Sequence, residues 1–523
     1  MTSYFSVSFV CLIFPASVFA YAVVPRRFRW LVLLAASYWF VWILSQGLIV
    51  CVWTTTLTTY VCGRLLGVLY DRRNRALTHT SESRRALIDR YKGRARWIVA
   101  AGITFNVGML AALKYCGPLS VLLDGLGFKE RLPVIGAPVG ISYYTLMAVA
   151  YLVDVYREAL PTERNLGHVA LYLCFFPCVM EGPIARYAEV APTLWAGSPL
   201  KGRNAYAGSL RMVVGFAKKL VIADRLGVMV GKVFDNYASY DGSIIALAAV
   251  AYTVQLYCDF SGTMDVALGM ARTFGIKLPE NFRGPFFSKT ASEFWRRWHI
   301  TLGAWFRDYV YYPVLFSKPC KALALRARRR LGKRLGTTLV SICALFFVWL
   351  GNGIWHGAGT QFIAFGMYYF VIISLGNLVE HLAQELASRL RVNRDAFPYQ
   401  ALRIVRTLVI VCVGELVFRA KGFDVAVEML RRMAEQPGVS SLVDGTVLSL
   451  GLDAQDLWAV GVGTACVLLL DAIGERLESP WDVMASKGPI VRCVVLVFAL
   501  AVVAVFGAYG YGYVAVDPMY ASF

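Results

Sequence analysis

Apolar residues recur along this chain in runs that are long enough for helices to cross a membrane. A spanning helix needs roughly 20 mostly apolar residues, and such runs begin at residues 5–24, continue through 30–67 and end at 491–505. By this rule we expect about ten to twelve spans. The pattern therefore predicts an all-α, polytopic integral membrane protein.

Five longer polar segments separate the apolar runs, namely residues 71–96, 157–168, 317–334, 382–400 and 421–456. The first and third are expected to be polar loops. The last two carry mixed charge with amphipathic spacing, which is typical of surface loops or interfacial helices. Since neither a long flexible linker nor a repeat of fixed period divides the sequence, we expect residues 1–523 to form a single membrane domain.

Composition and charge add an orientation to this picture. The chain is 58% hydrophobic and only 16% charged, with a formal net charge of +20. Basic residues concentrate at 25–29, 71–96 and 317–334, and because a basic excess in short loops marks the cytoplasmic side, these segments should face inward. We therefore expect an extracytoplasmic N-terminus. Because no lysine or arginine precedes the first apolar run, we also expect an uncleaved first span. Attraction to anionic membrane lipid explains the charge better than nucleic acid binding does.

An aromatic and charged helix is predicted between residues 293 and 313. Large apolar side chains recur there at spacings of three and four, which places them on one helix face. Glu293 and Arg297 are spaced for an i,i+4 ion pair on another face. Such a helix would lie at a membrane interface or line a wet cavity.

One histidine stands out as candidate chemistry. Residues 336–379 contain no Asp, Glu, Lys or Arg, yet His356 lies inside the sequence GNGIWHGAG at 351–359. We expect the four glycines to break the helix and to let a ligand approach the backbone closely. Burial disfavours the charged imidazolium, so this histidine would remain neutral and able to act as a general base. From this stretch alone, a purely structural histidine is equally compatible with the sequence.

Three carboxylates interrupt otherwise apolar segments, namely Glu181, Asp259 and Asp265. Unpaired charge is costly in lipid, so we expect them to orient helices through ion pairs. The available partners are the three arginines Arg296, Arg297 and Arg307. Histidine and cysteine spacings do not suggest a metal site, and the sequence has no nucleotide-binding fingerprint.

Several motifs together resemble the membrane-bound O-acyltransferase family. They are, in family order, PVGISYYT at 138–145 leading to DVYR at 154–157, FFPCVMEGPIARY at 175–187, QLYCDFSGTMD at 255–265, NFRGPFFS at 281–288 followed by EFWRRWHI at 293–300, and WHGA at 355–358. The similarity covers most of the chain. It is greatest to the bacterial branch that serves alginate and peptidoglycan O-acetylation and teichoic acid D-alanylation.

The resemblance implies a ring of helices around a funnel, with His356 as the catalytic histidine and His299 in the same tunnel. We expect substrate or tunnel contacts from Trp298, Trp355, Asn352, Glu293, Arg296, Arg297, Asp259 and Ser261. The resemblance further implies that no cofactor is bound and that an acyl thioester, either acyl-CoA or an acyl carrier protein, is the donor substrate. The acceptor would be a hydroxyl of an extracytoplasmic glycan or of a partner protein, at the inner membrane of a bacterium.

Two other functional classes fit the composition. A transporter or export channel for glycan or lipid would also use ionisable residues at membrane depth, such as Asp259 and Glu293, although such proteins often contain internal repeats. A purely structural membrane subunit is the third alternative.

Overall fold

The structure is a computed structural model of the full chain, and it describes residues 4–79, 83–125, 136–477 and 479–509. Throughout these ranges, every regular element is a helix. Three of the short elements, η1, η4 and η7, are π-helical. The all-α prediction is therefore confirmed.

Contacts divide the structure into two compact units, and each draws on separate stretches of the chain. Among the described residues, the first unit contains 4–79, 83–125, 136–212 and 263–279, and the second contains 213–262, 280–477 and 479–509. Two helices, α9 (Gly202–Ala217) and α11 (Gly242–Thr273), contribute residues to both units. A single membrane domain stays a prediction.

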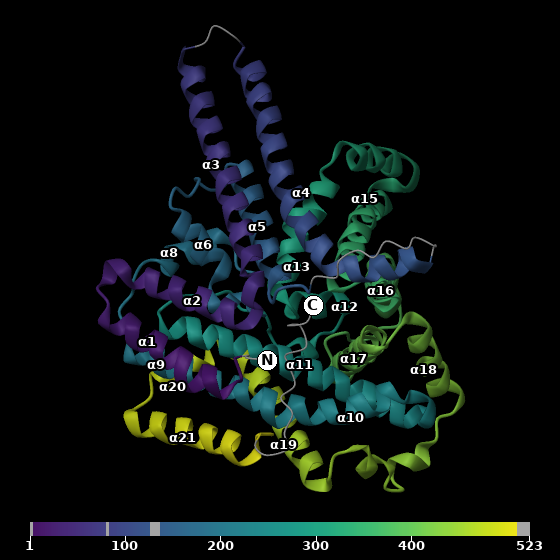
Figure 1. The fold of residues 1–523 in the computed structure, drawn as a ribbon. Coiled ribbons are helices and arrows are strands. Elements are labelled where there is room, and N and C mark those ends of the chain that lie inside the picture. The colour runs from purple at the N-terminus through teal and green to yellow at the C-terminus, as the bar shows by residue number, and fades with distance from the viewer. Residues whose placement is uncertain (1–3, 80–82, 126–135, 478, 510–523) are drawn as a thin grey trace. The chain divides into compact units, whose positions relative to one another are not determined.

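The first unit is built around long helices near the N-terminus. Its elements, besides its parts of α9 and α11, are η1 (Phe9–Ile13), α1 (Phe14–Val23), η2 (Arg26–Phe28), α2 (Arg29–Ser45), η3 (Gln46–Leu48), α3 (Ile49–His79), α4 (Arg84–Gly125), α5 (Ile141–Tyr156), α6 (Leu166–Cys174), α7 (Phe176–Val179) and α8 (Tyr187–Leu194). Figure 1 shows α3 and α4 side by side as a hairpin.

Glycines allow the helices of this hairpin to approach α5 and the segment after it. A Cβ atom added to Gly102 of α4 would lie 2.8 Å from Leu152 Cδ1, and one added to Gly67 of α3 would lie 2.5 Å from Thr162 Oγ1. Both distances are shorter than van der Waals contact, so a side chain at either position would displace its neighbour and disturb this packing.

The second unit contains the remaining elements. They are η4 (Lys218–Ala223), α10 (Asp224–Asp235), η5 (Tyr237–Ser239), η6 (Pro285–Phe287), α12 (Ala291–Arg297), α13 (Ile300–Phe306), η7 (Arg307–Tyr311), α14 (Tyr312–Leu315), α15 (Lys318–His356), α16 (Thr360–Arg389), α17 (Phe397–Arg419), α18 (Phe423–Glu435), η8 (Val439–Leu442), η9 (Thr446–Leu450), α19 (Ala454–Arg476), α20 (Pro480–Ala485) and α21 (Pro489–Phe506). Figure 1 labels most of them.

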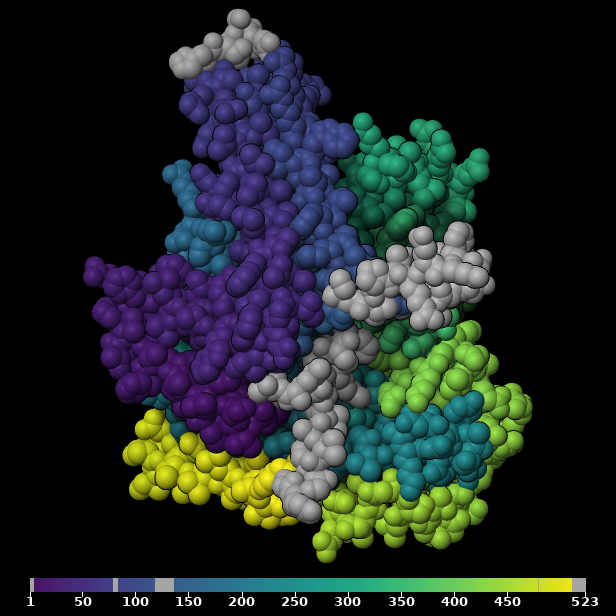
Figure 2. All heavy atoms as spheres, in the orientation of Figure 1, coloured from purple at the N-terminus to yellow at the C-terminus, as the bar shows by residue number. Residues whose placement is uncertain are grey.

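Two segments that we expected to be polar loops are largely helical. Residues 71–79 extend α3, residues 84–96 begin α4, and residues 318–334 lie in α15, which bends at Gly332, where φ is 80°. In Figure 2 the far ends of α3 and α4 extend past the other elements of the first unit. The loop prediction was wrong because charge was taken as the signal, whereas arginine, lysine, alanine and leucine are all good helix formers.

Seven segments of the described chain are long and apolar enough to cross a membrane, and one of them, Arg26–Thr78, holds both α2 and α3. The other six are Arg84–Gly117, Gly242–Thr273, Lys318–His356, Thr360–Arg389, Ala454–Arg476 and Pro489–Phe506. The expected count of about ten to twelve included shorter or more charged helices. For example, α5 has 16 residues, and α17 carries several charged side chains. The protein is thus a multi-pass membrane protein.

Candidate functional site

His356 is the last residue of α15 and lies in an aromatic enclosure. Only 3% of its surface is exposed. Its ring centroid lies 4.8 Å from that of Trp355, 5.0 Å from that of Phe418 and 5.9 Å from that of Phe365. Apolar rings on several sides keep bulk water from the imidazole, which strengthens polar interactions made there.

The glycines around His356 have two different roles. We expected all four to break the helix, but α15 continues through Gly351 and Gly353 and ends only at His356. Gly353 instead allows the backbone of α16 to approach, since an added Cβ would lie 2.6 Å from the carbonyl oxygen of Phe362. Gly357 and Gly359 follow the helix and form the turn into α16. The pair of helices therefore holds His356 at their junction.

His299 lies where the sequence predicted an unbroken helix, and that prediction was wrong. The segment is divided into α12, which ends at Arg297, and α13, which begins at Ile300. His299 has φ 45° and ψ 52°, in the left-handed region that residues other than glycine rarely occupy. The apolar periodicity continues across this break, so spacing alone could not locate it.

The ring of His299 is buried and has defined neighbours. Nδ1 lies 3.2 Å from Oδ1 of Asn281, and the ring packs edge to face on Phe260 at 4.8 Å. Burial lowers the pKa of His299 from its usual value to about 3, so the imidazole is neutral at physiological pH. The Trp355 ring lies 6.1 Å from His299 and 4.8 Å from His356, so a single indole connects the two histidines.

Two other predicted residues lie close to the histidines in the chain. Trp298 is buried beside His299 and stacks on Phe294 at 5.3 Å. Asn352 is also buried. It precedes His356 by one helical turn on the same face of α15. The side-chain oxygen of Asn352 accepts no hydrogen bond from the described residues. This polar atom is therefore suited to a ligand group.

Asp259 belongs to a buried ion cluster that sequence reasoning did not anticipate. Lys219 Nζ lies 2.6 Å from Asp259 Oδ1 and 2.9 Å from Asp224 Oδ1, and all three side chains are almost fully buried. Lys219 belongs to the π-helical turn η4, an irregularity that is frequent at functional sites. The available signal was the Lys218–Lys219 pair within an apolar run. Ser261, two residues after Asp259, is also buried.

In the first unit, Asp265 pairs with Arg211, whose Nε lies 2.8 Å from Oδ1. This arginine was not among the expected partners. Glu181 is fully buried in the same unit. Of the three expected arginines, Arg307 pairs instead with the adjacent Asp308, its Nε lying 2.8 Å from Oδ1. Arg296 and Arg297 are described next.

Of the three charged residues predicted to contact substrate from α12, two form an ion pair and one is exposed. The expected i,i+4 pair is confirmed, with Arg297 Nη2 at 2.9 Å from Glu293 Oε1. Arg297 also contacts Glu475 of α19 at 2.6 Å and donates to the carbonyl oxygen of Gly284. Arg296 is exposed. Arg297 therefore anchors α12, whereas the position of Arg296 does not support a buried substrate contact.

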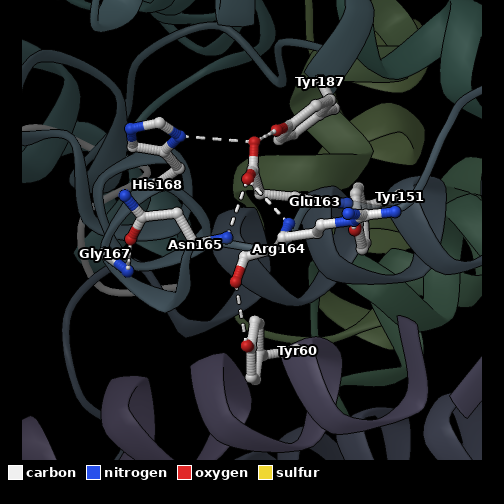
Figure 3. A network of polar contacts seen from close by, with 8 residues as sticks. All are labelled: Tyr60, Tyr151, Glu163, Arg164, Asn165, Gly167, His168 and Tyr187. Carbon is white, nitrogen blue, oxygen red and sulfur yellow. Dashed lines mark hydrogen bonds and ion pairs between the residues drawn. The ribbon is translucent and has the colours of Figure 1, made fainter. Parts of the chain in front are cut away.

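A network of polar contacts around Glu163 and His168, in the first unit, has a structural role (Figure 3). Glu163 accepts hydrogen bonds from the backbone amides of Arg164 and Asn165 and from the Tyr187 hydroxyl. His168 Nδ1 lies 3.3 Å from Glu163 Oε2, and its ring stacks on Trp195 at 4.2 Å. Burial alone would raise the pKa of Glu163, but its hydrogen bonds hold that pKa below the usual value. The network fixes the segment between α5 and α6.

Comparisons with known proteins identify the family of this chain. The sequence profile of the membrane-bound O-acyltransferase family matches residues 39–327, more than half of the chain. That match includes His299, and His356 follows it. A probable alginate O-acetylase of Azotobacter vinelandii is 32% identical over 435 residues, which cover 81% of this chain and 76% of the relative.

The names of two further relatives refer to other acceptors of the transferred group. A peptidoglycan O-acetyltransferase of Helicobacter pylori is 29% identical over 375 residues, 66% of each chain. A teichoic acid D-alanyltransferase of Bacillus subtilis is 29% identical over 289 residues, which cover 54% of this chain and 69% of the relative. This multi-pass protein is an acyltransferase and belongs to the membrane-bound O-acyltransferase family.

Proposed function

We propose that this enzyme transfers a small acyl group, such as acetyl, from a cytoplasmic thioester to a hydroxyl on the outer side of the inner membrane. His356 is the general base. The single observation that carries this assignment is the enclosure of His356 by Trp355, Phe365 and Phe418 at the junction of α15 and α16. A buried, neutral imidazole can take a proton from a hydroxyl.

The reaction balances with one base. His356 removes the hydroxyl proton as the oxygen attacks the thioester carbonyl carbon and a new C–O bond forms. The C–S bond then breaks, and the departing sulfur receives the proton from the imidazolium. The products are an ester and a free thiol. Apolar walls around His356 favour this sequence because water that could hydrolyse the thioester is kept away.

The relatives support a cell-envelope acceptor. Their names refer to alginate, peptidoglycan and teichoic acid, all of which lie outside the cytoplasmic membrane. We propose that the acceptor of this chain is a glycan hydroxyl or a hydroxyl of a partner protein that relays the group. Coenzyme A or an acyl carrier protein would carry the thioester.

The proposal is tested by following transfer from radiolabelled acetyl-coenzyme A into envelope material in membranes that contain the full chain. Removal of a general base typically costs about 10² to 10⁴ in rate, so we expect His356→Ala to lose nearly all transfer while its expression and melting in detergent are unchanged. His381→Ala is the matched control, because His381 is exposed near the end of α16. Transfer by His356→Ala at the native rate would contradict the assignment.

A further inference from the structure

The buried loop residue Asn281 contacts both the side chain and the backbone of the segment that carries His299. Only 1% of Asn281 is exposed. Its Oδ1 atom accepts the backbone N–H of Thr301 at 3.0 Å and the Thr301 hydroxyl at 2.9 Å, and it lies 3.2 Å from Nδ1 of His299. Its own carbonyl oxygen accepts the N–H of Ile300 at 3.0 Å.

These contacts determine which atoms carry hydrogen. A backbone N–H only donates, so the side-chain atom facing Thr301 N is the amide oxygen and not the amide nitrogen. An oxygen that faces Nδ1 of His299 must accept from it, so Nδ1 carries the proton. In a neutral imidazole the other nitrogen, Nε2, then holds a lone pair.

We infer that Asn281 is a positioning residue that fixes His299 as the Nδ1–H tautomer, so that Nε2 accepts a hydrogen bond from an O–H or N–H group of the bound substrate. The inference rests on the proposed function for its catalytic meaning. It divides the roles of the two histidines: His356 removes the proton, and His299 orients the substrate as an acceptor. His299 is then unable to donate to the oxyanion, which other groups must stabilise.

The surroundings of His299 favour a fixed and neutral ring. Phe260 of α11 and Trp355 of α15 pack against it, and neither carries charge. In the chain, Phe260 follows Asp259, which is paired with Lys219, and Trp355 precedes His356. The lowered pKa of His299 agrees with a ring that remains unprotonated during turnover.

The first test reads the tautomer directly and needs no acyl transfer. The full chain, labelled with ¹⁵N-histidine in nanodiscs, is compared with His299→Gln to assign the His299 signals. At neutral pH we expect Nδ1 of His299 to have the shift of a protonated nitrogen and Nε2 that of an unprotonated one. Asn281→Leu should mix the two tautomers. A protonated Nε2 in the native chain would overturn the inference, whatever the enzyme's activity.

The second test separates positioning from folding. We expect Asn281→Ala to lower kcat by about 10²-fold, the size expected of a misplaced catalytic group, and to cause no further loss in the His299→Ala background. Asn106→Ala is the control, because Asn106 is equally buried but bonds within its own helix to the carbonyl of Gly102. Independent, additive losses from Asn281→Ala and His299→Ala would refute coupling between the two residues.

The pH profile of acyl transfer by Asn281→Asp distinguishes a positioning role of Asn281 from a purely structural one. The carboxylate still accepts from Nδ1 and Thr301, so transfer should be restored at high pH. Its negative charge raises the pKa of His299, and the protonated ring has no lone pair on Nε2. We therefore expect a new loss of activity as pH falls, absent from the native profile. A pH profile for Asn281→Asp that matches the native one would reject the assignment.

Discussion

Glu163 illustrates how one partly buried carboxylate organises a polar segment. It accepts two backbone amides and the Tyr187 hydroxyl and pairs with His168. Together these contacts satisfy both carboxylate oxygens in a partly buried site, which is where hydrogen bonds to a charged group matter most. The sequence placed His168 in a polar segment, but it could not show that Trp195 stacks on its ring.

We predict that Glu163→Gln destabilises the protein in a pH-dependent way. The pKa of Glu163 is held below its usual value, so its charge stabilises the fold above the unfolded-state pKa. That contribution is lost as pH falls through the folded value. We expect a loss of about 1–3 kcal/mol at pH 7.5 that shrinks towards pH 4, measured by thermal unfolding in detergent. Glu385→Gln, in an exposed ion pair, should change little, and equal losses at both pH values would contradict the prediction.

At the scale of the element, the position of His356 depends on the contact between α15 and α16. Glycines on both helices face backbone: a Cβ added to Gly366 would lie 2.4 Å from the carbonyl oxygen of Trp349, and one added to Gly353 would lie 2.6 Å from that of Phe362. Backbone atoms cannot rotate away as side chains do. The separation of the two helices is therefore fixed by these positions.

Gly366→Ala should consequently separate the helices and displace His356. We expect a lower unfolding temperature and a loss of transfer approaching 10²-fold, because small displacements of a catalytic group are costly. Gly376→Ala in the same helix is the matched control: nothing lies within 4 Å of its added Cβ, and alanine is the better helix former. If both variants melted and reacted alike, close packing at Gly366 would not be what positions His356.

Much of the helical architecture could be predicted from apolar run length, because a chain in lipid must satisfy its backbone hydrogen bonds internally. The break at His299 could not. Residues 293–313 keep a helical apolar period on both sides of it, and Asn281, which bonds to Thr301 beside the break, is distant in sequence. The partners of Asp259 and Asp265 were missed for the same reason, since pairing between distant segments is not encoded in spacing.

At the scale of the whole molecule, the basic ends of α3, α4 and α15 bear on orientation. Residues 318–334 contain eight basic side chains and no acidic one. Because positive charge is retained on the cytoplasmic side, we expect the connection between α3 and α4 and the bend of α15 to face the cytoplasm. The N-terminus would then be extracytoplasmic.

Reporter insertions test this orientation. Green fluorescent protein inserted at residues 80–82 or at Gly332 should fluoresce, and alkaline phosphatase inserted at the same positions should be inactive. An N-terminal phosphatase fusion with its own export signal should be active. Phosphatase activity at residues 80–82 would reverse the predicted orientation, whereas acyl transfer by the tagged proteins would show that the insertions leave the enzyme folded.

The left-handed backbone at His299 makes position 299 informative in a saturation mutagenesis experiment. Its φ of 45° is accessible to glycine and is tolerated by asparagine, but it is strained for valine, isoleucine and threonine. A glycine at position 299 can therefore adopt this backbone conformation, but it has no side-chain hydrogen-bond acceptor. An asparagine can adopt the same backbone conformation and also has an amide oxygen that accepts a hydrogen bond. Survival of the asparagine variant alone would indicate selection on side-chain chemistry, whereas equal survival of both would indicate selection on the turn.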